Sequence, residues 1–131
     1  MVQIAEIVQV LKTQVPAGTV LTNYGNEASH RSLVKPPSVT PGDYEANAAV
    51  FNLRDLDDLI VDMYIIFRKR RNVNKVMTSY GWKHVLEKKR GKYVSNGMFI
   101  LAAYLSDFRV FWPKENGSYG VNPYFNMELR E

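Results

Sequence analysis

Residues 95–105 have the sequence SNGMFILAAYL, and this stretch decides the fold. Ser95 is placed to cap a helix, because its side-chain oxygen can accept a hydrogen bond from a backbone N–H in the first turn. From Met98 to Leu105 the helix is apolar on every side, which is typical of a helix buried in a protein core. We therefore expect the other elements to pack around this central helix.

Three further segments show the spacing of amphipathic helices. Apolar residues recur at intervals of three or four over residues 2–13, and again over about residues 53–70, where Asn52 can act as the cap. A third helix is predicted over about residues 73–89, and Gly91 ends it. The side chains expected on its buried side are Val76, Met77, Tyr80, Trp82 and Val85.

The C-terminal part of the chain is expected to form a β-hairpin. Residues 108–112 are mostly aromatic or β-branched, Asn116 and Gly117 are a turn signal, and residues 124–129 alternate between apolar and polar side chains. Pro123 lacks a backbone N–H, which predicts that the second strand lies at the edge of its sheet. The expected fold class is therefore α+β, with three to four helices around the buried central helix and a C-terminal hairpin.

One domain is expected for the 131 residues, of which 46% are hydrophobic and 23% charged. Residues 21–47 are rich in Asn, Ser, Pro and Gly and lack either periodicity, so we expect an irregular or mobile connection there. The chain has no cysteine, no signal-peptide pattern and no apolar run near the ~20 residues that span a membrane. These features predict a cytoplasmic protein without a membrane partner.

Two or three helices followed by a hairpin is an element order that resembles a winged-helix module. In such modules the helix before the hairpin presents polar side chains to the DNA groove. Residues 96–106 offer almost none. If nucleic acid is the ligand, we therefore expect the contact surface to be the basic helix and the tip of the hairpin.

Positive charge is concentrated in the middle of the chain. The formal net charge is +4, yet residues 68–92 contain ten basic residues and one acidic residue, Glu87. A helix dipole stabilises cations at a helix C-terminus, which accounts for one or two of these residues but not for a second cluster after the next helix. Such asymmetry favours an anionic partner. The candidate nucleic-acid-binding residues are Arg68, Lys69, Arg70, Arg71, Lys75, Lys83, Lys88, Lys89, Arg90, Lys92, Trp112 and Lys114.

These charges favour a small, non-enzymatic nucleic-acid-binding protein whose phosphate-facing surface is supplied by residues 68–92. The alternative is a protein-interaction module, an inhibitor or adaptor, that docks its basic face on an acidic partner surface. Such an interface needs an apolar anchor, and Trp82 or Trp112 would serve if exposed. Trp112 could instead stack on unpaired bases, although aromatic residues in strands more often serve packing.

Signals for catalysis are weak. The sequence contains neither a phosphate-cradling P-loop nor a serine nucleophile elbow. With His30 and His84 as the only histidines, a His-rich metal site is excluded. Asp43 upstream of the EKK triplet at residues 87–89 resembles the pattern of a metal-dependent nuclease, but such triplets arise by chance in basic helices. We therefore expect no enzymatic activity, no cofactor and no bound metal.

Overall fold

The computed structural model describes residues 1–26 and 42–130 of the chain. The helices are α1 (Ile4–Thr13), α2 (Tyr44–Ala48), α3 (Leu53–Ile66), α4 (Ser79–Arg90) and α5 (Asn96–Leu105). The strands are β1 (Leu21–Thr22), β2 (Gly25–Asn26), β3 (Phe67–Asn74), β4 (Val110–Phe111), β5 (Lys114–Glu115), β6 (Ser118–Tyr119) and β7 (Tyr124–Leu129). The fold is α+β, as expected, with a three-stranded antiparallel sheet formed by β3, β7 and β4.

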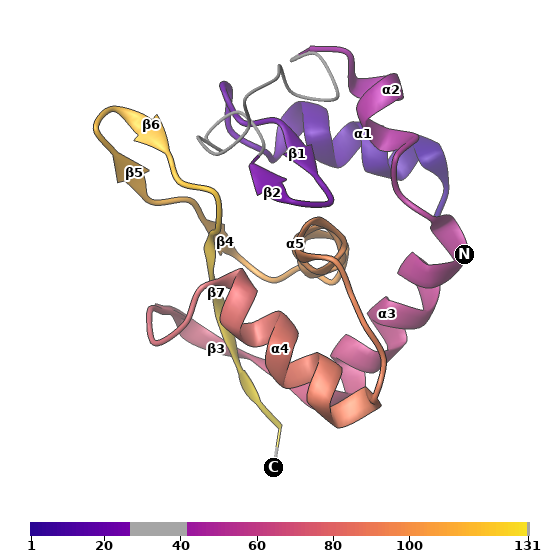
Figure 1. Cartoon of the computed structure of the whole chain (residues 1–131), viewed down its shortest axis with the longest axis vertical. Coiled ribbons are helices and arrows are strands. Elements are labelled where there is room, and N and C mark those ends of the chain that lie inside the picture. Colours follow the sequence, from indigo (N-terminus) through magenta and orange to yellow (C-terminus); the bar gives the residue numbers. More distant parts are fainter. Residues whose placement is uncertain (27–41, 131) are drawn as a thin grey trace.

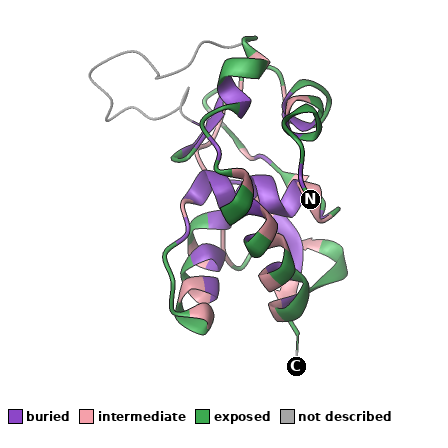
Figure 2. Cartoon of the chain, turned by 90° about the vertical axis from the view of Figure 1, so that its right-hand side faces the viewer, coloured by how far each residue is buried: buried purple, intermediate pink, exposed green. Residues whose placement is uncertain are grey.

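Helix α5 lies at the centre of the molecule, and Figure 1 views it along its axis with α1, α3 and α4 around it. Ser95 Oγ accepts a hydrogen bond from the Met98 N–H at 3.2 Å, which confirms the predicted cap. Residues 96–104 are all buried. Figure 2 shows buried segments, coloured purple, in the interior of the molecule. Burying each large apolar side chain, such as Phe99 or Ile100, contributes about 1.5 to 3 kcal/mol.

Helix α3 has the predicted cap and apolar face but ends earlier than expected. Asn52 Oδ1 accepts a hydrogen bond from the Asp55 N–H at 3.0 Å, and the buried side chains are Leu56, Leu59 and Met63. The prediction extended this helix to about residue 70, whereas the chain leaves helical geometry after Ile66.

Strand β3 replaces the last turn of the predicted helix. Phe67 has extended backbone angles (φ −114°, ψ 157°), and its ring centroid lies 5.7 Å from that of Trp82 and 5.9 Å from that of Phe99, edge to face. The basic residues that follow offer no apolar face for a helix to bury, and pairing with β7 satisfies their backbone groups instead. The cations at residues 68–71 therefore lie on a strand, and a helix dipole does not explain them.

Strand β7 lies in the middle of the sheet, so the prediction that Pro123 places it at an edge is wrong. Pro123 precedes the first paired residue, Tyr124, and its missing N–H therefore removes no ladder bond. The Pro123 carbonyl accepts the Ser79 N–H at 2.8 Å and so holds the start of α4. Phe125 and Met127 are fully buried, as the predicted alternation requires, but Asn126 between them is also buried and Leu129 is 39% exposed.

Helix α4 begins later than predicted, at Ser79, because the preceding residues complete strand β3 and the turn after it. Val76 is 80% exposed and Tyr80 is 52% exposed, so the prediction that both are buried is wrong. Trp82 is buried, as expected. Gly91 ends the helix with a left-handed φ of +67°, which a residue without a Cβ adopts at little cost.

The predicted irregular connection over residues 21–47 contains regular elements at both of its ends. Strands β1 and β2 form a small antiparallel hairpin, and Asp43 caps α2 by accepting the Ala46 N–H at 3.2 Å. Strand pairing at residues 21–26 and helix capping at Asp43 thus produce regular elements where the sequence lacks hydrophobic periodicity. Residues 27–41 lie outside the described residues.

The predicted C-terminal hairpin is present, with a second hairpin at its end. Strand β4 pairs antiparallel with β7, and the chain between them forms the β5–β6 hairpin. Asn116 and Gly117 have φ angles of 53° and 82°, as the Asn-Gly turn signal predicts. Among the described residues, no helix is both long and apolar enough to cross a membrane.

Candidate nucleic-acid interface

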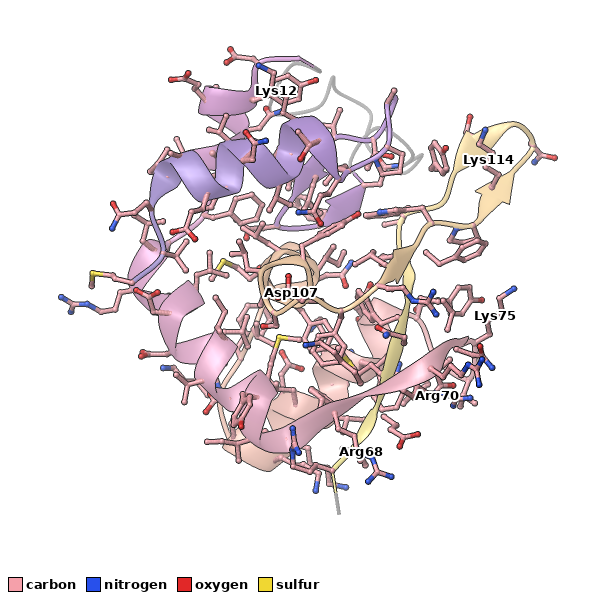
Figure 3. All side chains as sticks on the ribbon, turned by 180° about the vertical axis from the view of Figure 1, so that it is seen from behind. Lys12, Arg68, Arg70, Lys75, Asp107 and Lys114 are labelled. Atoms are coloured by element: carbon pink, nitrogen blue, oxygen red, sulfur yellow. The ribbon has the colours of Figure 1, made fainter. Side chains whose placement is uncertain are left out.

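Strand β3 carries several of its cations where its pairing with β7 is interrupted by a bulge-like irregularity. Between the paired residues Lys69 and Asn74, the register between β3 and β7 shifts. A bulge bends its strand and re-aims the side chains that it carries. Residues 70–72 are exposed, and Figure 3 shows Arg70 and Lys75 projecting outward at the same edge of the molecule.

Two buried asparagines hold this bulge in place. Asn126 Nδ2 donates to the Arg70 carbonyl at 3.0 Å, and Asn126 Oδ1 accepts the Arg109 N–H at 2.7 Å. The Arg109 guanidinium in turn donates to the Arg71 carbonyl. Asn74 Nδ2 donates to a β7 carbonyl at 3.0 Å. Because the backbone is fixed from both sides, the bulge presents its side chains in a defined position.

We call the exposed cations Arg70, Arg71, Lys75 and Arg109 the basic bulge. No carboxylate of the described residues forms an ion pair with any of them. Lys75 Nζ lies 5.0 Å from the ring centroid of Phe111, and this ring is 43% exposed. The surface therefore combines unpaired positive charge with one accessible aromatic side chain.

Arg109 and Phe111 were not among the predicted site residues. The signal that identifies them is the alternation over residues 108–112, in which Phe108 and Trp112 are buried. In a strand the intervening side chains point to the opposite face. Arg109 and Phe111 are exposed on that face, next to the bulge of β3.

Three other predicted cations lie away from the basic bulge or have local partners. Arg68 Nε is 2.6 Å from Glu128 Oε2 on β7, which is a cross-strand ion pair. Lys69 precedes the bulge, because it is still in register with Met127 on β7, and its Nζ lies 5.5 Å from the ring centroid of Phe108. Lys114 is on the separate β5–β6 hairpin, as Figure 3 shows.

The second predicted cluster lies at the C-terminal end of α4. Lys88, Lys89 and Lys92 are exposed, whereas Arg90 Nε is 2.9 Å from Asp62 Oδ2 on α3. Helix α4 has 12 residues and is therefore about 18 Å long, and it separates this cluster from the turn that follows β3. The structure thus divides the predicted basic segment into two surfaces.

Two predicted contact residues are buried in the structure. Lys83 is 4% exposed, and its Nζ lies 3.1 Å from Glu87 Oε2. Trp112 is 5% exposed and donates from Nε1 to the Tyr104 hydroxyl at 2.7 Å. Burial raises the pKa of Tyr104 to about 12, although this hydrogen bond works in the opposite direction. Neither Lys83 nor Trp112 therefore belongs to the exposed basic bulge.

Glu87 is the acceptor that holds the middle of α4 to the loop after it. Glu87 Oε2 accepts hydrogen bonds from the Lys83 ammonium at 3.1 Å and from the Val94 N–H at 3.0 Å. Glu87 Oε1 is 2.8 Å from His84 Nδ1. Burial by itself raises the pKa of Glu87, but the hydrogen bonds from Val94, Lys83 and His84 outweigh it and lower the pKa below 4.5. Glu87 is therefore ionised in the folded protein at neutral pH.

Replacing Glu87 by Gln should destabilise the protein in a pH-dependent way. Hydrogen bonds to charged groups contribute about 1.5 to 3 kcal/mol, and we expect a loss in that range at pH 7. A carboxyl whose pKa is lowered by folding stabilises the protein above pH 4.5, and this contribution disappears as pH falls through the folded pKa. Urea denaturation of parent and Glu87→Gln at pH 7 and below pH 4.5 measures the difference, which should shrink in acid. An equal difference at both pH values would contradict the assigned role.

Comparison with protein-family models, curated proteins and solved structures found no match. Within the described residues, no group of three or more His, Asp or Glu side chains is arranged to hold a metal ion. Asp43 and Glu87, the carboxylates of the nuclease-like pattern, act as a helix cap and as an ion-pair partner.

Proposed function

We propose that this protein binds nucleic acid without catalysis, through phosphate contacts made by the basic bulge. The observation that supports the proposal most directly is the set of four exposed cations that form no ion pair with a carboxylate of the described residues. Three of the four are arginines, whose planar guanidinium matches the geometry of a phosphate group. Lys88, Lys89 and Lys92 at the end of α4, and Lys114 on the hairpin, supply secondary contacts.

The buried hydrogen bonds that hold the basic bulge support a ligand-binding role rather than a role in solubility alone. A charged surface that only keeps a protein soluble needs no particular backbone geometry. Here Asn126 and Asn74, both buried, are committed to holding the carbonyls and strands around residues 70–73. Burying a polar side chain destabilises a protein unless the side chain is hydrogen-bonded. Here two buried asparagines make their hydrogen bonds to the backbone around the exposed arginines, and so hold that backbone in place.

The alternative partner is an acidic protein surface. Trp82 and Trp112, the expected apolar anchors, are each 5% exposed and cannot fill that role. Phe111 is the apolar side chain that lies within reach of the basic bulge. A protein interface on this face would therefore depend on Phe111.

Fluorescence anisotropy with a labelled 20-nucleotide duplex and the matching single strand, from 50 to 200 mM salt, tests the proposal. Replacing Arg70, Arg71 and Lys75 together by Gln should weaken binding to every sequence about equally. Each lost phosphate contact should reduce the slope of log affinity against log salt by about 0.9 on duplex or 0.7 on single strand, so three contacts remove roughly 2 to 3 units. Arg109 is kept because its guanidinium supports the bulge.

The matched control removes the same charge at the other end of α4, by replacing Lys88, Lys89 and Lys92 with Gln. Both triple variants should melt close to the parent, because exposed substitutions usually change stability by no more than about 0.5 kcal/mol each. A larger loss in the bulge variant than in the control supports the proposal. Equal losses would indicate a nonspecific charge effect, and a parent that binds neither strand at 50 mM salt would overturn it.

A further inference from the structure

A second candidate site lies beside α4 and consists of other residues than the basic bulge. A cleft of about 520 Å³ opens between α4, the loop that precedes α5, the β1–β2 turn and the segment before β7. Tyr80, Lys83, His84 and Tyr93 are among the side chains that line it. Its volume lies within the range of roughly 300 to 1,000 Å³ typical of small-molecule sites.

The floor of the cleft is a buried hydrogen-bond network centred on Asn96. Asn96 Nδ2 donates to the Tyr24 carbonyl at 2.8 Å and to Asn122 Oδ1 at 2.6 Å, and Ser79 Oγ donates to Asn96 Oδ1 at 2.8 Å. Asn96 is 6% exposed and Ser79 is fully buried. The network joins four separate segments of the chain, so the walls of the cleft are held in fixed positions relative to one another.

Three tyrosines line the cleft beside this hydrogen-bond network. Tyr24, Tyr80 and Tyr93 are 57%, 52% and 76% exposed. The Tyr80 ring packs edge to face with the His84 ring, with 4.5 Å between centroids. Exposed aromatic rings beside a cleft offer stacking surfaces for a flat ligand, as in proteins that bind unpaired bases.

A buried ammonium group lies between two of these rings. Lys83 Nζ is 5.2 Å from the Tyr80 centroid and 5.0 Å from the Tyr93 centroid, and it makes one hydrogen bond among the described residues, to Glu87. An ammonium group has three N–H donors, so it retains donor capacity for an anionic ligand. Glu87 is the carboxylate among the described lining residues, and both of its oxygens already accept hydrogen bonds.

We propose that this cleft binds a nucleotide, with the base stacked on Tyr93 and the phosphate close to Lys83. The stacking surfaces favour a planar ring, and the buried cation favours a negative charge on the same ligand. Asn23 and Asn122 line the cleft and carry amides that can donate and accept hydrogen bonds at the edge of a base. A neutral sugar would use the rings and the amides but not the cation.

The nucleotide can be a free molecule or one unit of a single strand. Binding of a single strand rests on the proposed function. Binding of a free nucleotide does not, because the cleft and the basic bulge consist of different residues. Titration calorimetry with adenosine, guanosine, cytidine and uridine 5′-monophosphates measures the first source. Anisotropy with an eight-nucleotide mixed-sequence single strand measures the second.

The decisive variant is Tyr93→Ala, which removes a 76% exposed ring and should not affect folding. Stacking energies predict that it weakens nucleotide or single-strand binding by about 5- to 150-fold. Tyr64→Ala on α3 is the matched control, because that ring is 75% exposed and does not line the cleft. Inorganic phosphate, adenosine and glucose probe the separate parts of the proposed ligand.

Binding of a nucleotide or of the single strand that Tyr93→Ala weakens and Tyr64→Ala does not would support the proposal. Adenosine binding as tightly as its monophosphate, or glucose binding with the same dependence on Tyr93, would overturn it. So would nucleotide and strand binding that is insensitive to Tyr93. If strand binding then responds only to the triple variant of the basic bulge, the proposed function stands and the cleft proposal fails.

Discussion

The Ala102→Asp variant is expected not to fold. Ala102 is fully buried in the middle of α5, and the buried surroundings of α5 are predominantly apolar. An unpaired carboxylate at such a position costs several kcal/mol whether it stays charged or takes up a proton. Single substitutions that exceed about 4 to 5 kcal/mol are exceptional, and whole domains are stable by only about 5 to 15 kcal/mol. Circular dichroism should therefore show no cooperative thermal transition.

The control is the same substitution at an exposed position, Ala5→Asp in the first turn of α1. A negative charge there interacts favourably with the helix dipole, by about 0.3 to 1 kcal/mol, so this variant should melt like the parent or slightly higher. A normal melting transition for Ala102→Asp would show that α5 is not the centre of the core.

Hydrophobic periodicity was sufficient to predict the core of this fold. Helix α5 is apolar on every side and α3 is apolar on one, and each begins at a polar cap, Ser95 or Asn52, that can be recognised in the sequence. Such signals are local, because burial of a helical face depends on residues three or four apart. They locate α1, α3 and α5 without knowledge of what packs against them.

Strand β3 could not be predicted in the same way. Residues 67–74, FRKRRNVN, do not alternate between apolar and polar side chains, and basic residues are good helix formers. The strand exists because Phe67 enters the core and β7 lies alongside it, and both are tertiary effects. The error at the end of α3 follows directly, since propensity alone favours continuing the helix through the arginines.

The candidate interface, too, could be predicted only in part from the sequence, because its geometry depends on tertiary contacts. The composition of residues 68–92 indicated a charged surface, but a sequence does not say which cations are already paired or buried. The structure buries Lys83 beside Glu87 and pairs Arg90 with Asp62, and it adds Arg109 from the segment just before β4. The proposed binding surface therefore depends on which strands are neighbours in the sheet.

Replacing Gly97 by Ala is expected to destabilise the protein by at least about 3 kcal/mol, although the change adds a single methyl group. Overpacking commonly costs about 1 to 3 kcal/mol, with the higher values where the surroundings cannot move. A Cβ at Gly97 would lie 1.6 Å from the Thr22 carbonyl oxygen and 2.7 Å from Asn23 Cα, both of them backbone atoms. The Gly97 N–H donates to the Asn23 carbonyl at 3.0 Å, so this close approach holds the β1–β2 turn on the start of α5.

Urea denaturation of Gly97→Ala and of the matched control Gly81→Ala measures the effect. Gly81 lies inside α4, where a Cβ would meet the Met77 side chain, with Sδ at 2.8 Å, Cβ at 3.0 Å and Cγ at 3.1 Å. The outer atoms of a methionine are flexible and can move aside, and the preference for alanine over glycine in a helix, about 1 kcal/mol, offsets the remaining contact with Cβ. Gly81→Ala should therefore cost much less than Gly97→Ala. Similar midpoints for the two variants would mean that the β1–β2 turn does not rest on α5. Because that turn also contributes Tyr24 to the wall of the cleft, the same substitution should displace one of its three tyrosines.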